Sequence, residues 1–248
     1  GKMELIGLHC HIGTFMLSTD AYATAVKKLG DLAWKCKTQL NNSIQYIDLG
    51  GGFPSANTLR GSFLPGTDNV PSVDEFAEAI TKSLLQIGFG ADEMPLLILE
   101  SGRVLIDDAG YLLASVIANK RLSDGRRATI LDAGVNLLFT SFWYDHKISP
   151  AQDFTQHSED MVLYGPLCMN IDVIRQSINL PILNRGDKVV VHKVGAYNMT
   201  QWMQFIQMRP NVILIDEQGQ THLVRAAEDL QYIEQPEHIP EHLKPIDL

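Results

Sequence analysis

Short apolar runs alternate with longer amphipathic segments through the first hundred residues of the chain. The runs at residues 4–11, 44–49 and 95–100 each end at glycine or at charged residues, and they predict buried strands. Helical periodicity fills the two intervals between them. Strands that alternate with amphipathic helices are typical of a parallel sheet covered by helices.

Two amphipathic helices are expected between these strands. The first has apolar residues at intervals of three or four behind a capping Ser18 or Thr19. The second begins behind a capping box formed by Ser72 and Glu75. The intervening residues 53–70 are rich in glycine, proline, asparagine and serine, which predicts a long loop that does not pack.

The pattern changes after Arg103, where strand-like runs follow one another and helical periodicity becomes weak. These runs lie at residues 110–118, 128–131, 188–191 and 212–215. Asp124 and Gly125 form a hairpin signal between the first two runs. A helix is expected only over residues 203–208, and the proline-containing tail from Gln235 is expected to form a surface strap.

We therefore expect two domains, an α/β domain over residues 1–104 and a mostly β domain over residues 105–248. Three parallel strands are too few for a closed (β/α)8 barrel, which needs eight strands and about 250 residues. The first domain could supply only the last three strands of such a barrel. The sequence is accordingly interpreted as the carboxyl-terminal part of a longer protein.

Composition narrows the possible partners. The sequence has 20 Lys and Arg residues against 29 Asp and Glu residues, a net charge of −9, which argues against nucleic acid or anionic membranes as partners. It contains no apolar run of about 18 residues, and its first residues predict a strand and not a signal peptide. The three cysteines are far apart and show no metal-ligand spacing, so we expect a reduced, cytosolic, soluble protein without a metal site.

Candidate chemistry follows each of the three predicted parallel strands. The first leads to His11 and Thr14, the second to the glycines 50–52, and the third to Glu100 and Arg103. The carboxyl ends of parallel strands open into one mouth, where glycine amides and an arginine can hold a phosphate. Taken singly, each feature has an ordinary structural explanation: a scaffold histidine, a strand-end turn and an ion pair. The glycines also lack the spacing of a dinucleotide fingerprint and the lysine of a P-loop.

Three further segments lie in the predicted β domain: 144–146 (Tyr-Asp-His), 164–172 (Tyr-Gly-Pro-Leu-Cys-Met-Asn-Ile-Asp) and 195–197 (Gly-Ala-Tyr). Cys168 follows a Gly-Pro turn and is therefore expected on a loop. A loop cysteine is a better candidate for chemistry than one on an apolar helix stripe, where Cys36 lies.

The motifs in this order resemble the fold-type III pyridoxal-phosphate-dependent decarboxylases, the ornithine and diaminopimelate decarboxylase family. The resemblance covers residues 5–200 and rests on six segments, 7–14, 49–54, 100–103, 144–146, 165–168 and 195–197. It implies the last strands and helices of an alanine-racemase-like (β/α)8 barrel followed by a C-terminal β-barrel or sandwich domain. It also implies amino-acid decarboxylation with pyridoxal 5'-phosphate as cofactor.

The resemblance assigns a role to each matching residue. His11 would stack on the cofactor ring, and Glu100 would pair with the pyridinium nitrogen, which favours decarboxylation over racemisation. The phosphate would be held by Thr14, Gly51, Gly52, Gly102, Arg103 and Tyr197. Cys168 would protonate the product carbon after CO2 leaves. In the family this cysteine comes from the partner subunit, so the resemblance implies an obligate homodimer with shared active sites.

Three departures from the family pattern stand out. None of the lysines fits the position of the cofactor-bearing Schiff-base lysine, so an N-terminal barrel segment or a separate chain is expected to supply it. Ser101 stands where proline is usual. Met169 replaces the acid that grips the distal amine of a basic or diamino acid substrate, and a thioether cannot bind a cation in that way. Tyr144 and Asp145 remain candidates for substrate binding, with Asp145 able to take an amine.

Two other functions stay open at this stage. A non-catalytic regulatory or binding subunit would explain the missing lysine, but it has no use for Glu100 and Cys168. An amino-acid racemase of the same fold would be distinguished by its product, because the amino acid would lose its optical rotation without release of CO2.

Overall fold

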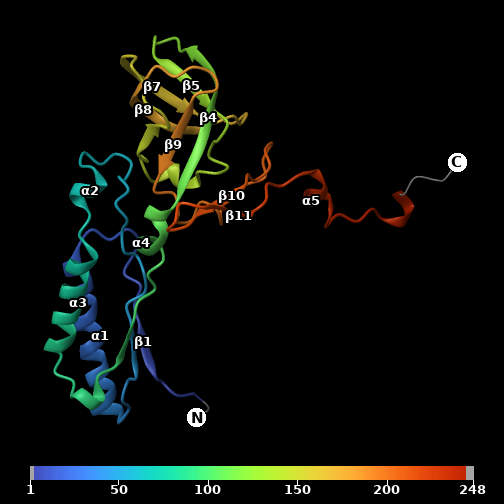
Figure 1. The fold of residues 1–248 in the computed structure, drawn as a ribbon. Helices are drawn as coiled ribbons and strands as arrows, with labels where there is room; N and C mark the ends of the chain where they lie inside the picture. The colour runs from blue at the N-terminus through green and yellow to red at the C-terminus, as the bar shows by residue number, and fades with distance from the viewer. Residues whose placement is uncertain (1–2, 244–248) are drawn as a thin grey trace.

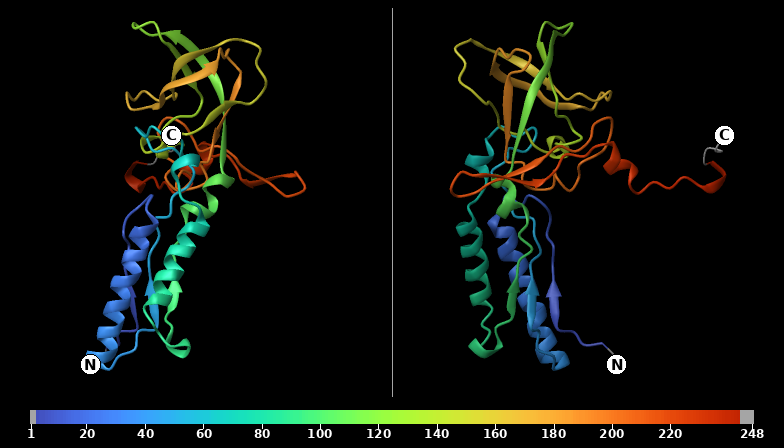
Figure 2. Two further views of the ribbon diagram at one scale, coloured as in Figure 1. Left: turned by 90° about the vertical axis from the view of Figure 1, so that its left-hand side faces the viewer. Right: turned by 45° about the vertical axis from the view of Figure 1, so that its right-hand side comes forward.

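The computed structural model describes residues 3–243 and arranges them in two parts that stack end to end (Figure 1). One part has a small parallel sheet with helices on one face, and the other has a larger mixed sheet. A hairpin and an extended arm leave the region where the two parts meet (Figure 2). Within the described residues, none of the helices has the length and apolar character that a membrane span requires.

The small sheet contains three parallel strands in the order β1-β2-β3, as the alternating pattern predicts. Its strands are β1 (Gly7–His9), β2 (Tyr46–Asp48) and β3 (Leu96–Ile98). They are shorter than the apolar runs, although backbone hydrogen bonds between the segments continue beyond them, for example from the Cys10 amide to the carbonyl of Asp48 and from the Glu100 amide to the carbonyl of Gly50. Helices α1 and α3 cover one face of this sheet, and the other face is open (Figure 1).

Both predicted helices form. Helix α1 (Thr19–Leu40) begins after Ser18 and ends at Asn41, which adopts a left-handed φ of 50°. Helix α3 (Val73–Gln86) begins with the expected capping box, in which the Ser72 side chain accepts from the Glu75 amide. The apolar stripes of the two helices pack with Ile47, Leu49 and Phe53 in one core cluster. A 3-10 turn, η1 (Ala91–Glu93), precedes β3.

The loop over residues 53–70 differs from the prediction. Apart from the short helix α2 (Gly66–Asn69) it has no helix or strand, yet Phe53, Ser55 and Asn57 are buried. The expectation that this loop does not pack was wrong. Its polar side chains find buried hydrogen-bond partners in the connection to the second part, and so burial does not leave them unsatisfied.

The connection between the two parts is the short helix α4 (Arg103–Ile106) followed by the 3-10 turn η2 (Asp107–Ala109). A six-stranded sheet follows, in the order β6-β9-β4-β5-β7-β8. Its strands are β4 (Tyr111–Arg121), β5 (Arg127–Leu131), β6 (Ile148–Pro150), β7 (Ser158–Tyr164), β8 (Val173–Pro181) and β9 (Lys188–His192). The predicted hairpin joins β4 to β5, with Gly125 at a φ of 86°.

The core of this sheet consists of buried apolar side chains from all six strands, among them Leu131, Met161, Ile174 and Val191. Strands β5 and β7 pair in parallel, whereas every other pair in the sheet is antiparallel. A long connection therefore returns from β5 to β7. That connection contains the 3-10 helix η3 (Phe139–Phe142) and the segment with Tyr144.

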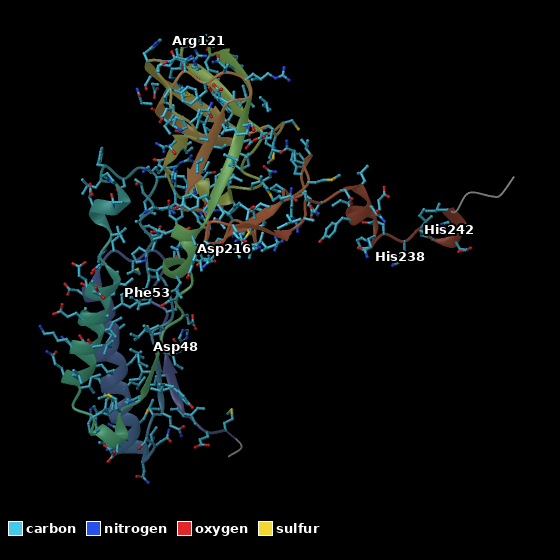
Figure 3. All side chains as sticks on the ribbon, viewed as in Figure 1. Asp48, Phe53, Arg121, Asp216, His238 and His242 are labelled. Carbon is cyan, nitrogen blue, oxygen red and sulfur yellow. The ribbon has the colours of Figure 1, made fainter. Side chains whose placement is uncertain are left out.

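Two expectations for the C-terminal region were wrong. Residues 203–208 form no helix, because Ile206 has a φ of 67° and the Met203 amide donates to the carbonyl of Asn136. The tail does not strap the body, since residues 235–243 lead away from it. In Figure 3, His238 and His242 mark this arm, and Asp216 marks the separate hairpin. The last five residues of the tail lie outside the described residues.

The hairpin pairs β10 (Val212–Ile215) with β11 (Thr221–Arg225) in antiparallel fashion. The arm contains helix α5 (Leu230–Glu234) and a last 3-10 turn, η4 (Glu241–Leu243). Large apolar side chains along both are exposed, for example Ile215 and Leu230.

Candidate functional site

The carboxyl ends of β1, β2 and β3 point toward the second part of the molecule and bring three motifs together. Figure 3 shows the direction, with Asp48 at the end of β2 and Phe53 beyond it toward the junction. His11, after β1, accepts a hydrogen bond at Nδ1 from the Gly51 amide at 3.2 Å. A Cβ on Gly51 would lie 2.6 Å from the carbonyl oxygen of Glu100, after β3. All three motifs are therefore in direct contact.

The glycine turn after β2 has a structural requirement for glycine. Gly52 has a φ of 90°, and a Cβ there would lie 2.1 Å from the carbonyl oxygen of Gly13. Helix α1 supports the turn from below, since the hydroxyl of Tyr22 donates to the carbonyl of Gly51 at 2.8 Å. Burial raises the pKa of Tyr22 to about 12, so this donor stays protonated. The turn is rigid and brings backbone close to backbone.

Arg103 is the buried cation of the site. It begins helix α4, is 7% exposed, and donates from Nη2 to the hydroxyl of Thr14 at 3.0 Å. Its Nε and Nη1 atoms are buried and have no hydrogen-bond partner among residues 3–243. Burial lowers the pKa of the guanidinium, and interactions with Tyr197 and Asp107 oppose that shift. A guanidinium stays charged in proteins, so these two nitrogens are donors without an acceptor.

Aromatic rings surround this guanidinium. Its central carbon lies 4.8 Å from the ring centre of Tyr197, 5.3 Å from that of Phe15 and 5.6 Å from that of Tyr144. Tyr144 is buried, whereas Tyr197 is 43% exposed and has a left-handed φ of 67°. The structure therefore brings Tyr144 and Tyr197, from connections in the second part of the chain, to Arg103 at the strand end. Gly102 directly precedes Arg103, and a Cβ at this position would have no neighbouring atom within 4 Å.

These contacts define a site that fits an anion such as a phosphate. Donors that are buried without an acceptor are costly, and a bound anion would satisfy them. The glycine turn places backbone atoms close to the strand ends, and no Cβ of its own stands in the way of a bound group. The residues present therefore fit the phosphate group of pyridoxal 5'-phosphate.

Glu100 lies on the open face of the small sheet, where its carboxylate is 3.9 Å from Nε2 of His9. Together with Asp48, these two groups could contribute ligand atoms within 4.8 Å of one another. The sequence predicted no metal site, and the spacing of these residues gave no signal of their proximity. Asp48 also accepts a hydrogen bond from the Gly50 amide at 2.8 Å, which ties it to the glycine turn.

The Cys168 loop joins β7 to β8 and lies on the surface of the large sheet, as expected for a loop cysteine. Buried Asp172 shapes the loop by accepting from the amides of Leu167 at 2.8 Å and Val135 at 2.7 Å. No hydrogen bond or ion pair within the described part of the chain joins the Cys168 or Met169 side chain to the strand-end groups.

Asp145 has two arginine neighbours. Its Oδ1 lies 3.5 Å from Nε of Arg175 and 3.9 Å from Nε of Arg60. The Asp145 amide also donates to the carbonyl of Thr58 at 2.9 Å, which joins this segment to the loop after β2. A substrate amine would have to compete with both arginines for this carboxylate.

The sequence did not predict one buried carboxylate at the site, that of Asp107. Asp107 is buried, and its carboxylate accepts hydrogen bonds from Ser55, Asn57 and the amide of Ala196. Its neighbour Asp108 is exposed, and two adjacent acids at the end of a helix are ordinarily a solvated pair. The polar residues directly after the glycine turn were the available signal, since buried polar groups need partners.

Comparisons with known proteins agree with this geometry. A family model described as "Pyridoxal-dependent decarboxylase, C-terminal sheet domain" matches residues 36–195. The chain is 29% identical over 248 residues to diaminopimelate decarboxylase of Methanothermobacter thermautotrophicus, covering 97% of this chain and 55% of that protein. For diaminopimelate decarboxylase of Aquifex aeolicus the identity is 29% over 238 residues, covering 95% and 53%.

Solved structures give the same result. The crystal structure of diaminopimelate decarboxylase from M. jannaschii superposes with a TM-score of 0.86 at 27% identity, covering 98% of this chain and 55% of that chain. Lysine/ornithine decarboxylase from Vibrio vulnificus, complexed with cadaverine, superposes with a TM-score of 0.69 at 25% identity, covering 81% and 52%. The chain thus spans about half the length of the relatives it matches.

The family model covers the glycine turn, Glu100, Arg103, the Cys168 loop and the large sheet, which together make up well over half of the 248 residues. Four of the six motifs that suggested the resemblance lie within this match, the segment with His11 precedes it, and the segment 195–197 begins at its last residue. The chain belongs to the pyridoxal-dependent decarboxylase family, and it contains the C-terminal sheet domain of that family.

Proposed function

We propose that the protein containing this chain decarboxylates an amino acid with pyridoxal 5'-phosphate as cofactor. The observation that carries the proposal is the buried Arg103, with two unpartnered nitrogens beside a glycine turn at the ends of parallel strands. An anion there would satisfy donors that otherwise remain without partners. The diaminopimelate and lysine/ornithine decarboxylases that the chain resembles support the reaction class.

The residues of this chain would hold the cofactor at its two ends. Bound pyridoxal phosphate supplies an electron sink for cleavage of the bond to the carboxylate carbon. Glu100 would hold a proton at the ring nitrogen, and His11 would lie against the ring. The phosphate would be bound by Thr14, Gly51, Gly52, Gly102, Arg103 and Tyr197.

Cys168 would deliver the proton to the product carbon. Its exposed loop, which is not joined to the strand-end groups by any described side-chain contact, is consistent with a contribution to the site of a second subunit. We therefore propose a homodimer with shared active sites. An N-terminal barrel segment, in the same protein or in a separate chain, would carry the lysine that binds the cofactor.

The division of the chain follows the same proposal. Residues 1–104 would form the C-terminal part of a (β/α)8 barrel, and residues 105–248 would form the sheet domain. The parallel order of β1, β2 and β3, with α1 and α3 on one face, supports the barrel assignment. The three free cysteines support a reducing, cytoplasmic setting.

The group of the substrate farthest from its α-carbon would differ from the ammonium group of a simple diamino acid. Met169 beside Cys168 offers no carboxylate, and Asp145 is engaged by two arginines. We therefore propose that Tyr144, Asp145 and Met169 contact a distal group that is not a simple ammonium. The test is an activity series over ornithine, lysine, arginine and diaminopimelate. A strong preference for ornithine that disappears in Met169→Ala would contradict this assignment.

The reaction itself is tested with the full-length protein. It is incubated with pyridoxal phosphate, reduced with borohydride and examined by intact mass, and CO2 release from each amino acid is measured in parallel. One pyridoxyl adduct together with CO2 release is expected. An adduct with loss of optical rotation but no CO2 would indicate a racemase, and no adduct would favour a regulatory subunit.

A further inference from the structure

Asp107 lies at the point where the two parts of the chain meet, with 2% of its surface exposed. Its Oδ2 atom accepts from the hydroxyl of Ser55 and from Nδ2 of Asn57, the latter at 2.8 Å. Its Oδ1 atom accepts from the amide of Ala196 at 3.1 Å. One carboxylate therefore joins the segment after the glycine turn, the helix that begins with Arg103, and the residue before Tyr197.

Backbone contacts close the same junction. The Gly195 amide donates to the carbonyl of Asp107 at 3.1 Å, and Nδ2 of Asn57 also donates to the carbonyl of Lys193 at 2.9 Å. A Cβ on Gly195 would lie 1.9 Å from the carbonyl oxygen of Ile106, so the two backbones are in close contact. The three segments cannot separate without breaking hydrogen bonds that are shielded from water.

Asp107 is also the buried counter-charge of Arg103. Burial raises the pKa of Asp107, while its hydrogen bonds and the charge of Arg103 oppose the shift. The two side chains form no direct ion pair among the salt bridges of residues 3–243. The negative charge of Asp107 favours the charged form of Arg103. Because other donors occupy both Asp107 oxygens, Nε and Nη1 of the arginine remain available.

We propose that Asp107 is a positioning residue for phosphate binding, which holds the glycine-turn segment, Arg103 and Tyr197 in one geometry. The inference rests on the proposed function, since the phosphate is that of the cofactor. It goes further in assigning a role to a residue that would not itself touch the cofactor. A left-handed Tyr197 costs free energy, and the bond from its neighbour Ala196 to Asp107 helps to hold it there.

The test compares two ligands that differ only in the phosphate. In the full-length apoprotein, dissociation constants are measured for pyridoxal phosphate and for pyridoxal. Asp107→Asn is expected to lower the preference for the phosphorylated ligand at least tenfold and to change pyridoxal affinity less than twofold. The control is Asp108→Asn, since this neighbour is 69% exposed in its side chain and lies 3.5 Å from Lys193. The control should keep the wild-type preference.

The outcomes separate the two proposals. A wild-type protein that binds neither ligand would refute the proposed function and this inference with it. A wild-type preference that Asp107→Asn retains would overturn the inference alone, and so would equal weakening of both ligands, which indicates a merely structural role. If Asp107→Asn does not fold, Asn57→Ala removes one donor from the same carboxylate. A reduced preference in that variant supports the inference, and an unchanged one refutes it.

Discussion

Replacing Arg103 with methionine should separate stability from binding. The guanidinium is buried with two nitrogens unpartnered, so the folded protein without cofactor gains little from it. Methionine keeps most of the side-chain volume and flexibility and introduces no donor. We expect Arg103→Met to leave the stability of the apoprotein within about 2 kcal/mol of wild type, a typical range for a single substitution. The affinity for pyridoxal phosphate should fall steeply.

The magnitudes follow from the contacts of Arg103. Each unpartnered buried donor costs about 1–3 kcal/mol, and the bond to Thr14 returns about 1.5–3 kcal/mol. The three aromatic rings each contribute roughly 0.5–2 kcal/mol, so in the apoprotein the favourable contacts exceed the cost of the unpartnered donors by only about 2 kcal/mol. Two charge-assisted bonds to a phosphate would together contribute about 3–6 kcal/mol. The dissociation constant should therefore rise by roughly 10²- to 10⁴-fold.

Urea unfolding of the full-length apoprotein and titration with pyridoxal phosphate measure the two quantities independently. Arg126→Met is the matched control, because Arg126 is exposed and its side chain pairs, among residues 3–243, with Asp124 and the carbonyl of Gln176, which are distant from the site. The reasoning would be refuted if Arg103→Met lost more than about 4 kcal/mol of stability while its cofactor affinity stayed at the wild-type value. That result would make Arg103 a structural residue.

Three further predictions concern other side chains. Cys168→Ala should leave cofactor affinity intact and cripple turnover, and unchanged kcat would remove its role as proton donor. Tyr197→Phe should weaken cofactor binding by about 1.5–3 kcal/mol, and an unaltered Kd would count against its phosphate contact. Burial lowers the pKa of His146 from 6.5 to about 4, so the unfolded state binds more protons between these pH values. Unfolding free energy should therefore fall by on the order of 3 kcal/mol as pH drops from 6.5 to 4. His146→Gln should flatten that part of the stability curve, and an unaltered slope would show that another group titrates.

The strand-end motifs could be placed together from the sequence because parallel topology leaves them little choice. Once residues 4–11, 44–49 and 95–100 are interpreted as parallel strands, their carboxyl ends must share one edge. The contact between His11 and Gly51 follows from that arrangement, as does the close approach of Gly51 to Glu100. The apolar runs and the parallel topology therefore predict the same contacts at the strand ends.

Contacts between the two parts of the chain could not be obtained in this way. Asp107 and its partner Ala196 are 89 residues apart, and neither carries a periodic signal. Strands β7 and β8 were missed because charged residues such as Glu159 and Arg175 interrupt the apolar pattern. The helix expected over residues 203–208 fails because tertiary contacts of Met203 override a short periodic run.

The Asp107 junction also sets an order of events during synthesis. Its donors Ser55 and Asn57 lie 52 and 50 residues before it, whereas Ala196 lies 89 residues after it. At about 5–20 residues per second, the ribosome needs on the order of 5–20 s to deliver that last partner. Until then Arg103 is not covered by Tyr197, and the junction beside the small parallel sheet lacks the hydrogen bond from Ala196 to Asp107. Acquisition of the anion site is therefore a late step in the maturation of this chain, and the Ala196 amide should gain protection from hydrogen exchange only after those of β2 and α1.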